Sequence, residues 1–168
     1  NYSGTVQRKY QITKAPLTVE TQSDSKVYDG KPLTAPGTVK GFVEGENAEL
    51  QVTGTQTAVG SSKNTYKIVW TETTKADNYQ VSETVGTLTV TDQSIEDSKK
   101  ITVGTLGNVV YNGKNQKQEP AVTTKDGKTT LVKGTDYTLS YSKDTKNVGE
   151  VTVTVTGKGS YSGTVQRK

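Results

Sequence analysis

The sequence contains no cysteine, no methionine and no histidine. Without cysteine there is no disulfide bond and no thiol chemistry, and without histidine the commonest general base and metal ligand is missing. Tryptophan and phenylalanine occur only once each. Such a composition is not typical of an enzyme, and the sequence predicts no catalytic residue, no metal site and no cofactor.

Long apolar segments are also missing. No run approaches the roughly 18 consecutive apolar residues that a membrane-spanning helix requires, so we expect no membrane span in this segment. The chain starts at Asn1 with neither an initiator methionine nor a signal peptide. We therefore expect the signal peptide and the anchor of a secreted parent protein to lie outside this segment.

The charge is nearly balanced, with 21 basic and 17 acidic residues and a net charge of +4. The basic residues are scattered and are not interleaved with stacking aromatics, which argues against a nucleic-acid partner. Thirty of the 168 residues are threonine, a residue that favours β-strands. Although the apolar content of 29% is low, the small net charge favours folded β modules with thin cores over disorder.

An exact internal repeat indicates how the chain is organised. Residues Tyr161 to Lys168 are identical to residues Tyr2 to Lys9, which lie 159 positions earlier. An identity of this length predicts a tandem array of which the chain covers about one period. Residues 1–14 are then predicted to be a terminal strand left from a preceding repeat, with a turn at Ser3-Gly4 and a module boundary near Lys14-Ala15.

A weaker repeat divides the period into two modules. Residues 27–31, Val-Tyr-Asp-Gly-Lys, correspond to residues 110–114, Val-Tyr-Asn-Gly-Lys, at an offset of 83. We therefore predict a β module A over residues 15–92 and a β module B over residues 93–168. The polar segment 92–100 is predicted to be a linker or a long loop between them.

The alternation of apolar and polar residues predicts an all-β chain of two tandem small modules, β-sandwich-like or β-grasp-like, in an elongated arrangement. Asp126-Gly127 between two alternating runs predicts a type I′ hairpin turn. The predicted strands are 17–21, 26–28, 38–42, 49–53, 65–71, 86–91, 101–106, 109–111, 121–124, 130–133, 137–142, 150–156 and 163–168.

Several spaced motifs carry a resemblance to a known family. They include Lys26-Val-Tyr-Asp-Gly-Lys-Pro-Leu33, Gly86-Thr-Leu-Thr-Val-Thr91, Lys133-Gly-Thr-Asp-Tyr137 and Gly157-Lys-Gly-Ser-Tyr161. In these motifs the chain resembles the MBG or YDG-type tandem repeat modules of Gram-positive cell-wall-anchored surface proteins. The resemblance implies an extracellular stalk or adhesin region, anchored to the cell wall, and a family without catalytic residues.

Five residues are candidates for ligand-facing or turn positions. An Asx-Gly pair preceded by tyrosine is typical of a tight turn, yet such a loop can also face a ligand. Trp70 shares one strand face with Tyr66 and Ile68, where it either completes a thin core or offers a platform for sugar stacking. None of the aspartates falls in a calcium-binding loop pattern. The candidates are Tyr28, Asp29, Trp70, Tyr111 and Asn112.

Two functions from different classes follow from these patterns. The first is a structural repeat that acts as an elongated stalk or spacer and projects an adhesive domain from the cell wall. The alternative is a low-affinity adhesin module that binds host glycan, mucin or matrix protein through many weak sites. The predicted partners are neighbouring repeats of the same chain, a host glycoprotein or glycan in the alternative, and a second molecule through strand exchange by residues 1–14. Intramolecular isopeptide or ester cross-links remain open, since lysine, asparagine, threonine and glutamine are all abundant.

Overall fold

The computed structural model describes residues 1–168 and consists of β-strands, one short 3₁₀ helix and no α-helix. This confirms the all-β fold class expected from the sequence. No helical segment has the length and apolarity needed to cross a bilayer. The elements are β1 (Ala15–Thr21), β2 (Asp24–Val27), β3 (Gly37–Lys40), β4 (Ala48–Val52), β5 (Gly60–Lys63), β6 (Tyr66–Trp70), η1 (Ala76–Asn78), β7 (Tyr79–Thr84), β8 (Thr87–Thr91), β9 (Gln93–Ser94), β10 (Ile101–Val103), β11 (Val122–Thr124), β12 (Tyr137–Tyr141), β13 (Val153–Gly157), β14 (Tyr161–Ser162) and β15 (Thr164–Arg167).

The chain forms two compact units, each assembled from several segments. Unit 1 contains Asn1–Asp24, Thr34–Thr55 and Ser62–Leu88. Unit 2 contains Ser25–Leu33, Gln56–Ser61 and Thr89–Lys168. The predicted division into modules 15–92 and 93–168, and their tandem arrangement, remain predictions.

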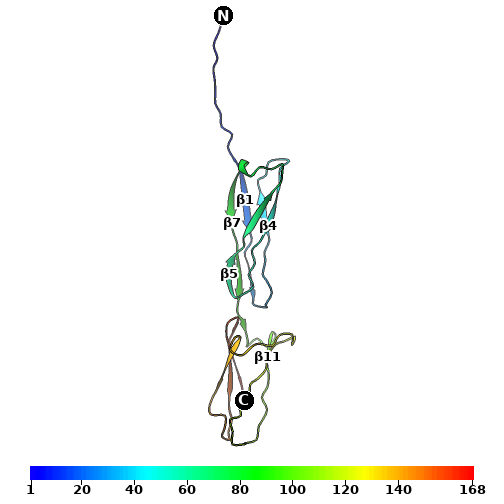
Figure 1. The fold of residues 1–168 in the computed structure, drawn as a ribbon, viewed down its shortest axis with the longest axis vertical. Helices are drawn as coiled ribbons and strands as arrows, with labels where there is room; N and C mark the ends of the chain where they lie inside the picture. Colours follow the sequence, from blue (N-terminus) through cyan, green and yellow to red (C-terminus); the bar gives the residue numbers. More distant parts are fainter. The chain divides into compact units, whose positions relative to one another are not determined.

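The main sheet of unit 1 is built around β1. This strand pairs antiparallel with β3 and parallel with β7, from Ala15↔Tyr79 to Glu20↔Thr84. Figure 1 shows β1 and β7 side by side along the length of β1. Leu17 and Val19 alternate with exposed residues and are completely buried, as the period of two in a half-buried strand requires.

Unit 1 also contains a two-stranded sheet. Strands β4 and β6 form an antiparallel pair from Ala48↔Trp70 to Val52↔Tyr66. The order β2-β8-β5 defines a three-stranded sheet in which β8 is central. Leu88 and Val90 alternate with threonines on β8 and are buried. The apolar residues of this alternating strand therefore face the core, and the threonines face away from it.

A buried polar network lies where β1 ends in unit 1. Asn64 is fully buried, and its Nδ2 donates to the carbonyl oxygens of Gln22 at 2.9 Å and Ala35 at 3.0 Å. The Thr21 Oγ1 hydroxyl donates to the Asn64 carbonyl oxygen at 2.8 Å and accepts from the Gly86 backbone N–H at 2.9 Å. The network therefore satisfies backbone groups at the break between β1 and β2 and at the break between β7 and β8.

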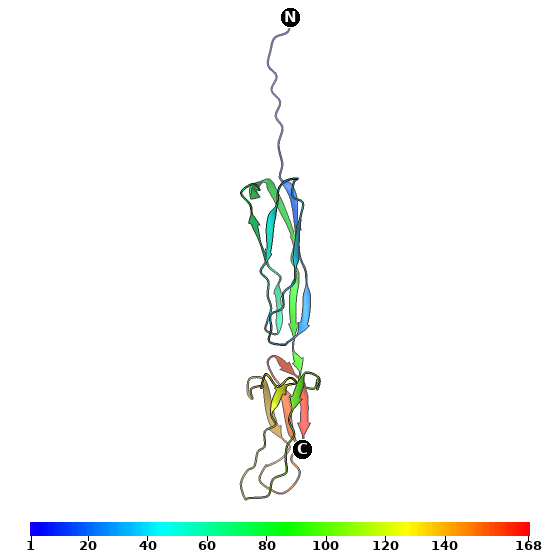
Figure 2. The same cartoon turned by 90° about the vertical axis from the view of Figure 1, so that its right-hand side faces the viewer.

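Unit 2 has three small sheets around one apolar cluster. The pairs are β10 with β11, β9 with β14 in parallel, and the three-stranded order β12-β13-β15. Figure 2 shows the orange β13 and the red β15 lying side by side. The buried cluster consists of Ile95, Ile101, Val103, Val122, Leu131, Tyr137 and Val155, with Leu139, Tyr161 and Val165 packed against it.

The predicted strand in residues 1–14 is not formed. The whole segment lies outside the strands, and the side chains of Tyr2, Val6 and Ile12 are 107%, 73% and 85% exposed. The reason is that a strand gains stability only through a neighbour that pairs with its backbone N–H and C=O groups. No segment of the chain pairs with residues 1–14.

Two other predicted strands, 109–111 and 130–133, are also wrong. Residues 109–111 belong to an irregular loop, and Thr130 and Lys133 form only isolated bridges to Thr123 and Tyr137. Conversely, the structure contains four strands that the sequence did not predict, which are β5, β7, β9 and β14. Short pairings of this kind depend on which segment the fold brings alongside, not on local pattern.

The segment 92–100 is not a free linker. It contains β9, whose Gln93 pairs with Tyr161 in parallel, and Ile95 is only 2% exposed within the core of unit 2. A single isoleucine among polar residues produces no alternation of apolar and polar positions, so the sequence predicted a linker or a long loop here.

The turn at Asp126-Gly127 is present but is not of type I′. Only Gly127 has a positive φ, at 70°, whereas type I′ requires positive φ at both central residues. The Asp126 carboxylate accepts from the Thr124 hydroxyl at 2.7 Å and from the Lys128 N–H at 3.1 Å. These bonds hold Asp126 in an ordinary backbone conformation.

Candidate functional site

The Tyr28-Asp29 turn has its polar groups satisfied locally. Asp29 Oδ1 accepts from Lys26 Nζ at 2.6 Å and from the Lys31 N–H at 2.9 Å, and Gly30 supplies a φ of 75°. The hydrogen bond from Lys26, followed by that from Lys31, lowers the pKa of the Asp29 carboxyl below its ordinary value. The carboxylate is thus held inside the turn by two donors.

The ring of Tyr28 packs against another ring instead of facing solvent alone. Its centroid lies 5.7 Å from that of Tyr161, at an interplanar angle of 84°, the edge-to-face geometry that aromatic pairs prefer. The Tyr28 backbone N–H donates to the Thr91 carbonyl oxygen at 2.8 Å. The side chains of Tyr28 and Asp29 are therefore both held by contacts within unit 2.

Trp70 belongs to an aromatic cluster in unit 1. It stacks on Tyr79 at 5.9 Å and 29°, and Phe42 meets Trp70 at 6.2 Å and Tyr79 at 5.5 Å, both edge-on. Trp70 is half-buried and Tyr79 is 3% exposed. The only tryptophan is packed into this cluster and does not form an open platform for sugar stacking.

Polar contacts complete this cluster. The Tyr79 hydroxyl donates to Glu46 Oε2 at 2.5 Å and accepts from the Val43 N–H at 3.1 Å. Burial, and then the hydrogen bond to Glu46, raises the pKa of Tyr79 above its ordinary value. The neutral Tyr79 hydroxyl therefore anchors the loop that carries Val43 and Glu46. The sequence did not predict this role of Tyr79.

The Tyr111-Asn112 turn repeats the geometry of the first turn but has a different environment. Asn112 Oδ1 accepts from the Lys114 N–H at 2.9 Å, and Gly113 has a φ of 77°. Tyr111 is 56% exposed and packs on no other aromatic ring. Tyr28 therefore packs on another aromatic ring, whereas its counterpart Tyr111 is largely exposed to solvent.

Tyr111 lines a cavity of unit 2 that has a volume of about 580 Å³. The Tyr141 ring also faces this cavity, and its hydroxyl donates to the Gln118 carbonyl oxygen at 3.0 Å. Thr145 Oγ1 is buried in the wall and has no hydrogen-bond partner. Beside the turn, Val110 is 87% exposed and Val148, in the wall, is also 87% exposed.

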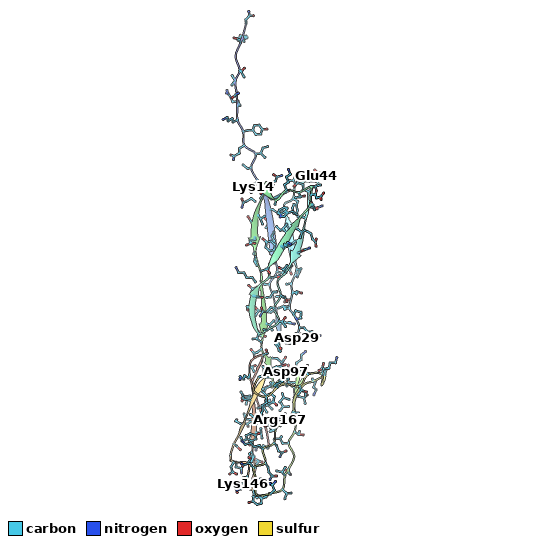
Figure 3. All side chains as sticks on the ribbon, viewed as in Figure 1. Lys14, Asp29, Glu44, Asp97, Lys146 and Arg167 are labelled. Carbon is cyan, nitrogen blue, oxygen red and sulfur yellow. The ribbon has the colours of Figure 1, made fainter.

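The five predicted residues do not form one site. Figure 3 places Asp29 at one end of unit 2 and Lys146, a residue of the cavity wall, at the other. Trp70 belongs to unit 1. The candidate binding surface is therefore the cavity around Tyr111. Tyr141, at the end of β12, and Thr145, in a loop, also line it, and the sequence did not predict them because only the fold brings them beside Tyr111.

The acidic side chains do not gather into a metal centre. No group of three or more histidine, cysteine, aspartate or glutamate side chains is placed to hold a metal ion. The exposed carboxylates Asp126 and Asp144 accept hydrogen bonds within their own turns, which lowers the pKa of each. These acids stabilise turns as anions.

Comparison with known proteins identifies one family. Residues 17–89 match the family model of the MBG domain, YGX type. The match confirms the resemblance to MBG-type repeat modules that the motifs indicated. Neither a curated protein nor a solved structure matches the chain. The MBG domain is a non-catalytic, structural repeat domain of surface proteins.

Proposed function

We propose, because residues 17–89 match the MBG domain, that this chain is an elongated spacer in the stalk of a surface protein. In this role it projects an adhesive domain away from the cell wall of a Gram-positive bacterium and carries out no catalysis. Neighbouring repeats of the same chain are its partners, and the reach of the stalk grows with their number.

The observation that carries this proposal is the parallel pairing of the first and last long strands of unit 1. Ala15 at the start of β1 lies opposite Tyr79 at the start of β7, and Glu20 lies opposite Thr84. The chain therefore enters β1 at one end of the β1–β7 pair and leaves β7 at the other end. A unit with its entry and exit at opposite ends adds its full strand length to a tandem array.

Unit 2 has a related arrangement. β9 and β14 are parallel, from Tyr161↔Gln93 to Ser162↔Ser94. β15 follows β14 directly and continues along β13 to Arg167. The β1–β7 pair of unit 1 and the β9–β14 pair of unit 2 are therefore both parallel, which supports the spacer.

Small-angle X-ray scattering tests the spacer function. A single compact globule of 168 residues has a radius of gyration of about 15 Å. We expect the value for this chain to be clearly larger, with a distance distribution that has a long tail. A radius of gyration at the compact value would rule out the spacer.

The cavity around Tyr111 favours a second function, the binding of a host glycan or mucin by many weak sites. Its volume of about 580 Å³ lies in the range of small-ligand sites, and it combines two tyrosines with the unpartnered Thr145 hydroxyl. Arrays of glycans probed with a multivalent form of the chain would test it. We expect binding that Tyr111→Ala removes and Tyr10→Ala leaves unchanged, and no signal at high valency would exclude this function.

A further inference from the structure

Asn112 is the only asparagine of this sequence that is followed by a glycine. Asparagine is a chemically labile residue, because the backbone nitrogen of the next residue can attack the Cγ atom of its side-chain amide. A side chain on that next residue obstructs the attack, and glycine has none. The pair Asn112-Gly113 is therefore the point of the sequence at which this reaction meets the least steric hindrance.

The structure leaves the two reacting groups of this pair unobstructed. Asn112 and Gly113 are both exposed, and the Asn112 Nδ2 amino group has no hydrogen-bond partner. The Gly113 backbone N–H has no partner either, and no atom lies within 4 Å of a Cβ built on this glycine. The attacking nitrogen and the leaving amino group are therefore both open to solvent.

Other asparagines of the chain are protected by their contacts and by the residue that follows them. Asn64 Nδ2 donates to two backbone carbonyl groups in a buried site, and Asn147 Nδ2 donates to Asp144 Oδ1 at 3.3 Å. A β-branched residue follows each of them, Thr65 in one case and Val148 in the other. In both places the amino group is held and the attacking nitrogen is shielded.

The equivalent turn of the chain already contains an acid at this position. At the offset of 83 that relates the two turns, Asn112 corresponds to Asp29. Lys26 donates to Asp29 Oδ1 at 2.6 Å, and the counterpart of this lysine is Val109. The turn is therefore compatible with a carboxylate, but a carboxylate at residue 112 has no lysine at residue 109 to pair with.

We propose that Asn112 is a site of spontaneous deamidation, which converts the neutral turn next to Tyr111 into an anionic one. The Gly113 nitrogen loses its proton to water and forms a bond to Asn112 Cγ. The Lys114 N–H, which donates to Asn112 Oδ1 at 2.9 Å, stabilises the negative charge that develops on this oxygen. The bond between Cγ and Nδ2 then breaks, the amino group leaves as ammonia, and a succinimide ring is closed.

Water opens the ring at either of its two carbonyl carbons, and no oxidant or reductant is needed. Attack at Cγ breaks the bond from Cγ to the Gly113 nitrogen and gives aspartate. Attack at the main-chain carbonyl carbon breaks the other carbon–nitrogen bond and gives isoaspartate, in which the main chain runs through the side chain of residue 112. Both products carry a new negative charge directly beside Tyr111, which lines the cavity of unit 2.

Peptide mapping by mass spectrometry on the intact chain tests the proposal, after incubation at mildly alkaline pH and physiological temperature. We expect the peptide that contains Asn112 to gain the mass difference between an NH₂ and an OH group several-fold faster than the peptides that contain Asn64 or Asn147. Chromatography should resolve an aspartate and an isoaspartate product. The rate should rise with pH, because the attacking nitrogen must lose its proton.

A free peptide of residues 108–116 gives the rate that the local sequence allows without the fold. Because both reacting groups are open in the structure, we expect the folded chain and the peptide to react at rates within several-fold of each other. Gly113→Ala adds a Cβ beside the attacking nitrogen and should slow the reaction in both. An Asn112 amide that persists in the folded chain while the peptide loses it would overturn the proposal, and so would equal rates at Asn112 and Asn147.

Discussion

Asn64 shows how one polar side chain organises a core that has few apolar residues. It is completely buried, and its Nδ2 bonds to two backbone carbonyl groups from different parts of unit 1. Gly54 and Gly86 leave room around this network, since a Cβ at Gly54 would lie 2.4 Å from Asn64 Oδ1. The sequence does not distinguish Asn64 from the other asparagines, because its importance depends on contacts with residues far away in the chain.

Replacing Asn64 tests this interpretation. In Asn64→Ala the carbonyl groups of Gln22 and Ala35 lose their partner in a buried site, so we expect a loss of about 1–3 kcal/mol in the free energy of unfolding. Urea denaturation followed by circular dichroism measures it. The exposed Asn78 serves as the control, and Asn78→Ala should change the free energy by less than about 0.5 kcal/mol. Equal effects of the two substitutions would contradict the role of the network.

Tyr66 makes the stability of unit 1 sensitive to alkaline pH. Burial, and then the hydrogen bond that its hydroxyl donates to Glu83, raises its pKa to about 12 from an ordinary value of 10.0. Folding therefore favours the neutral phenol. The contribution of Tyr66 is complete below pH 10 and is lost as the pH rises towards about 12.

The matched variant is Tyr66→Phe, which keeps the ring and removes the titrating group. We expect the urea midpoint of the wild-type chain to fall between pH 9 and pH 11.5 by more than the midpoint of the variant. The other tyrosines with raised pKa values, Tyr79, Tyr141 and Tyr161, are present in both proteins, so their effects cancel in the comparison. If the urea midpoints of the two proteins fell by the same amount, Tyr66 would not contribute to the loss of stability at alkaline pH.

At the scale of elements, the long alternating strands are predicted well and the short pairings are not. Val153 and Val155 on β13 are buried while Thr156 is exposed, as the alternation indicates. In contrast, β5 at Gly60–Lys63 has the composition of a turn and becomes a strand through its position next to β8. Its Ser61 hydroxyl lies 2.9 Å from that of Thr89. Pairing with the neighbouring strand β8 therefore makes this segment a strand, although its local sequence has the composition of a turn.

The close approach at the break between β7 and β8 depends on a glycine. A Cβ at Gly86 would lie 2.3 Å from the carbonyl carbon and oxygen of Gln22. We therefore expect Gly86→Ala to lower the free energy of unfolding by about 1–3 kcal/mol, because the backbone of one segment must move.

Gly107 is the control for this substitution, because no atom lies within 4 Å of a Cβ built there and its φ is not positive. Gly107→Ala should be neutral or slightly stabilising, since alanine restricts the unfolded chain. Thermal unfolding of both variants gives the comparison. If Gly86→Ala were as stable as Gly107→Ala, the approach to Gln22 would not constrain the fold.

At the scale of the whole molecule, the direction of the strands determines how the chain responds to tension between its two ends. Tension on the chain pulls β1 and β7 past one another along their length, because they are parallel neighbours and the chain enters and leaves at opposite ends of the pair. The hydrogen bonds of the pair are then loaded together and not one after another. This geometry is suited to a spacer under tension.

Single-molecule force spectroscopy on the chain tethered at its two ends tests this load path. Leu17 lies on β1 and is completely buried, so Leu17→Ala should lower the free energy of unfolding by about 2–5 kcal/mol and lower the unfolding force of unit 1. Thr18→Ala on the exposed face of the same strand is the control. Unchanged unfolding forces in Leu17→Ala would show that the β1–β7 pair does not bear the load.

The sequence by itself determined the all-β class, the internal eight-residue repeat and the family of residues 17–89, because alternation and motif spacing are local properties of the chain. Tertiary structure alone decided which strands pair, and so made Ile95 a core residue and Asn64 a buried organiser. The identical segments 2–9 and 161–168 show the reason most directly. One is a paired strand and the other is solvated, since a strand's backbone hydrogen bonds come from its neighbours.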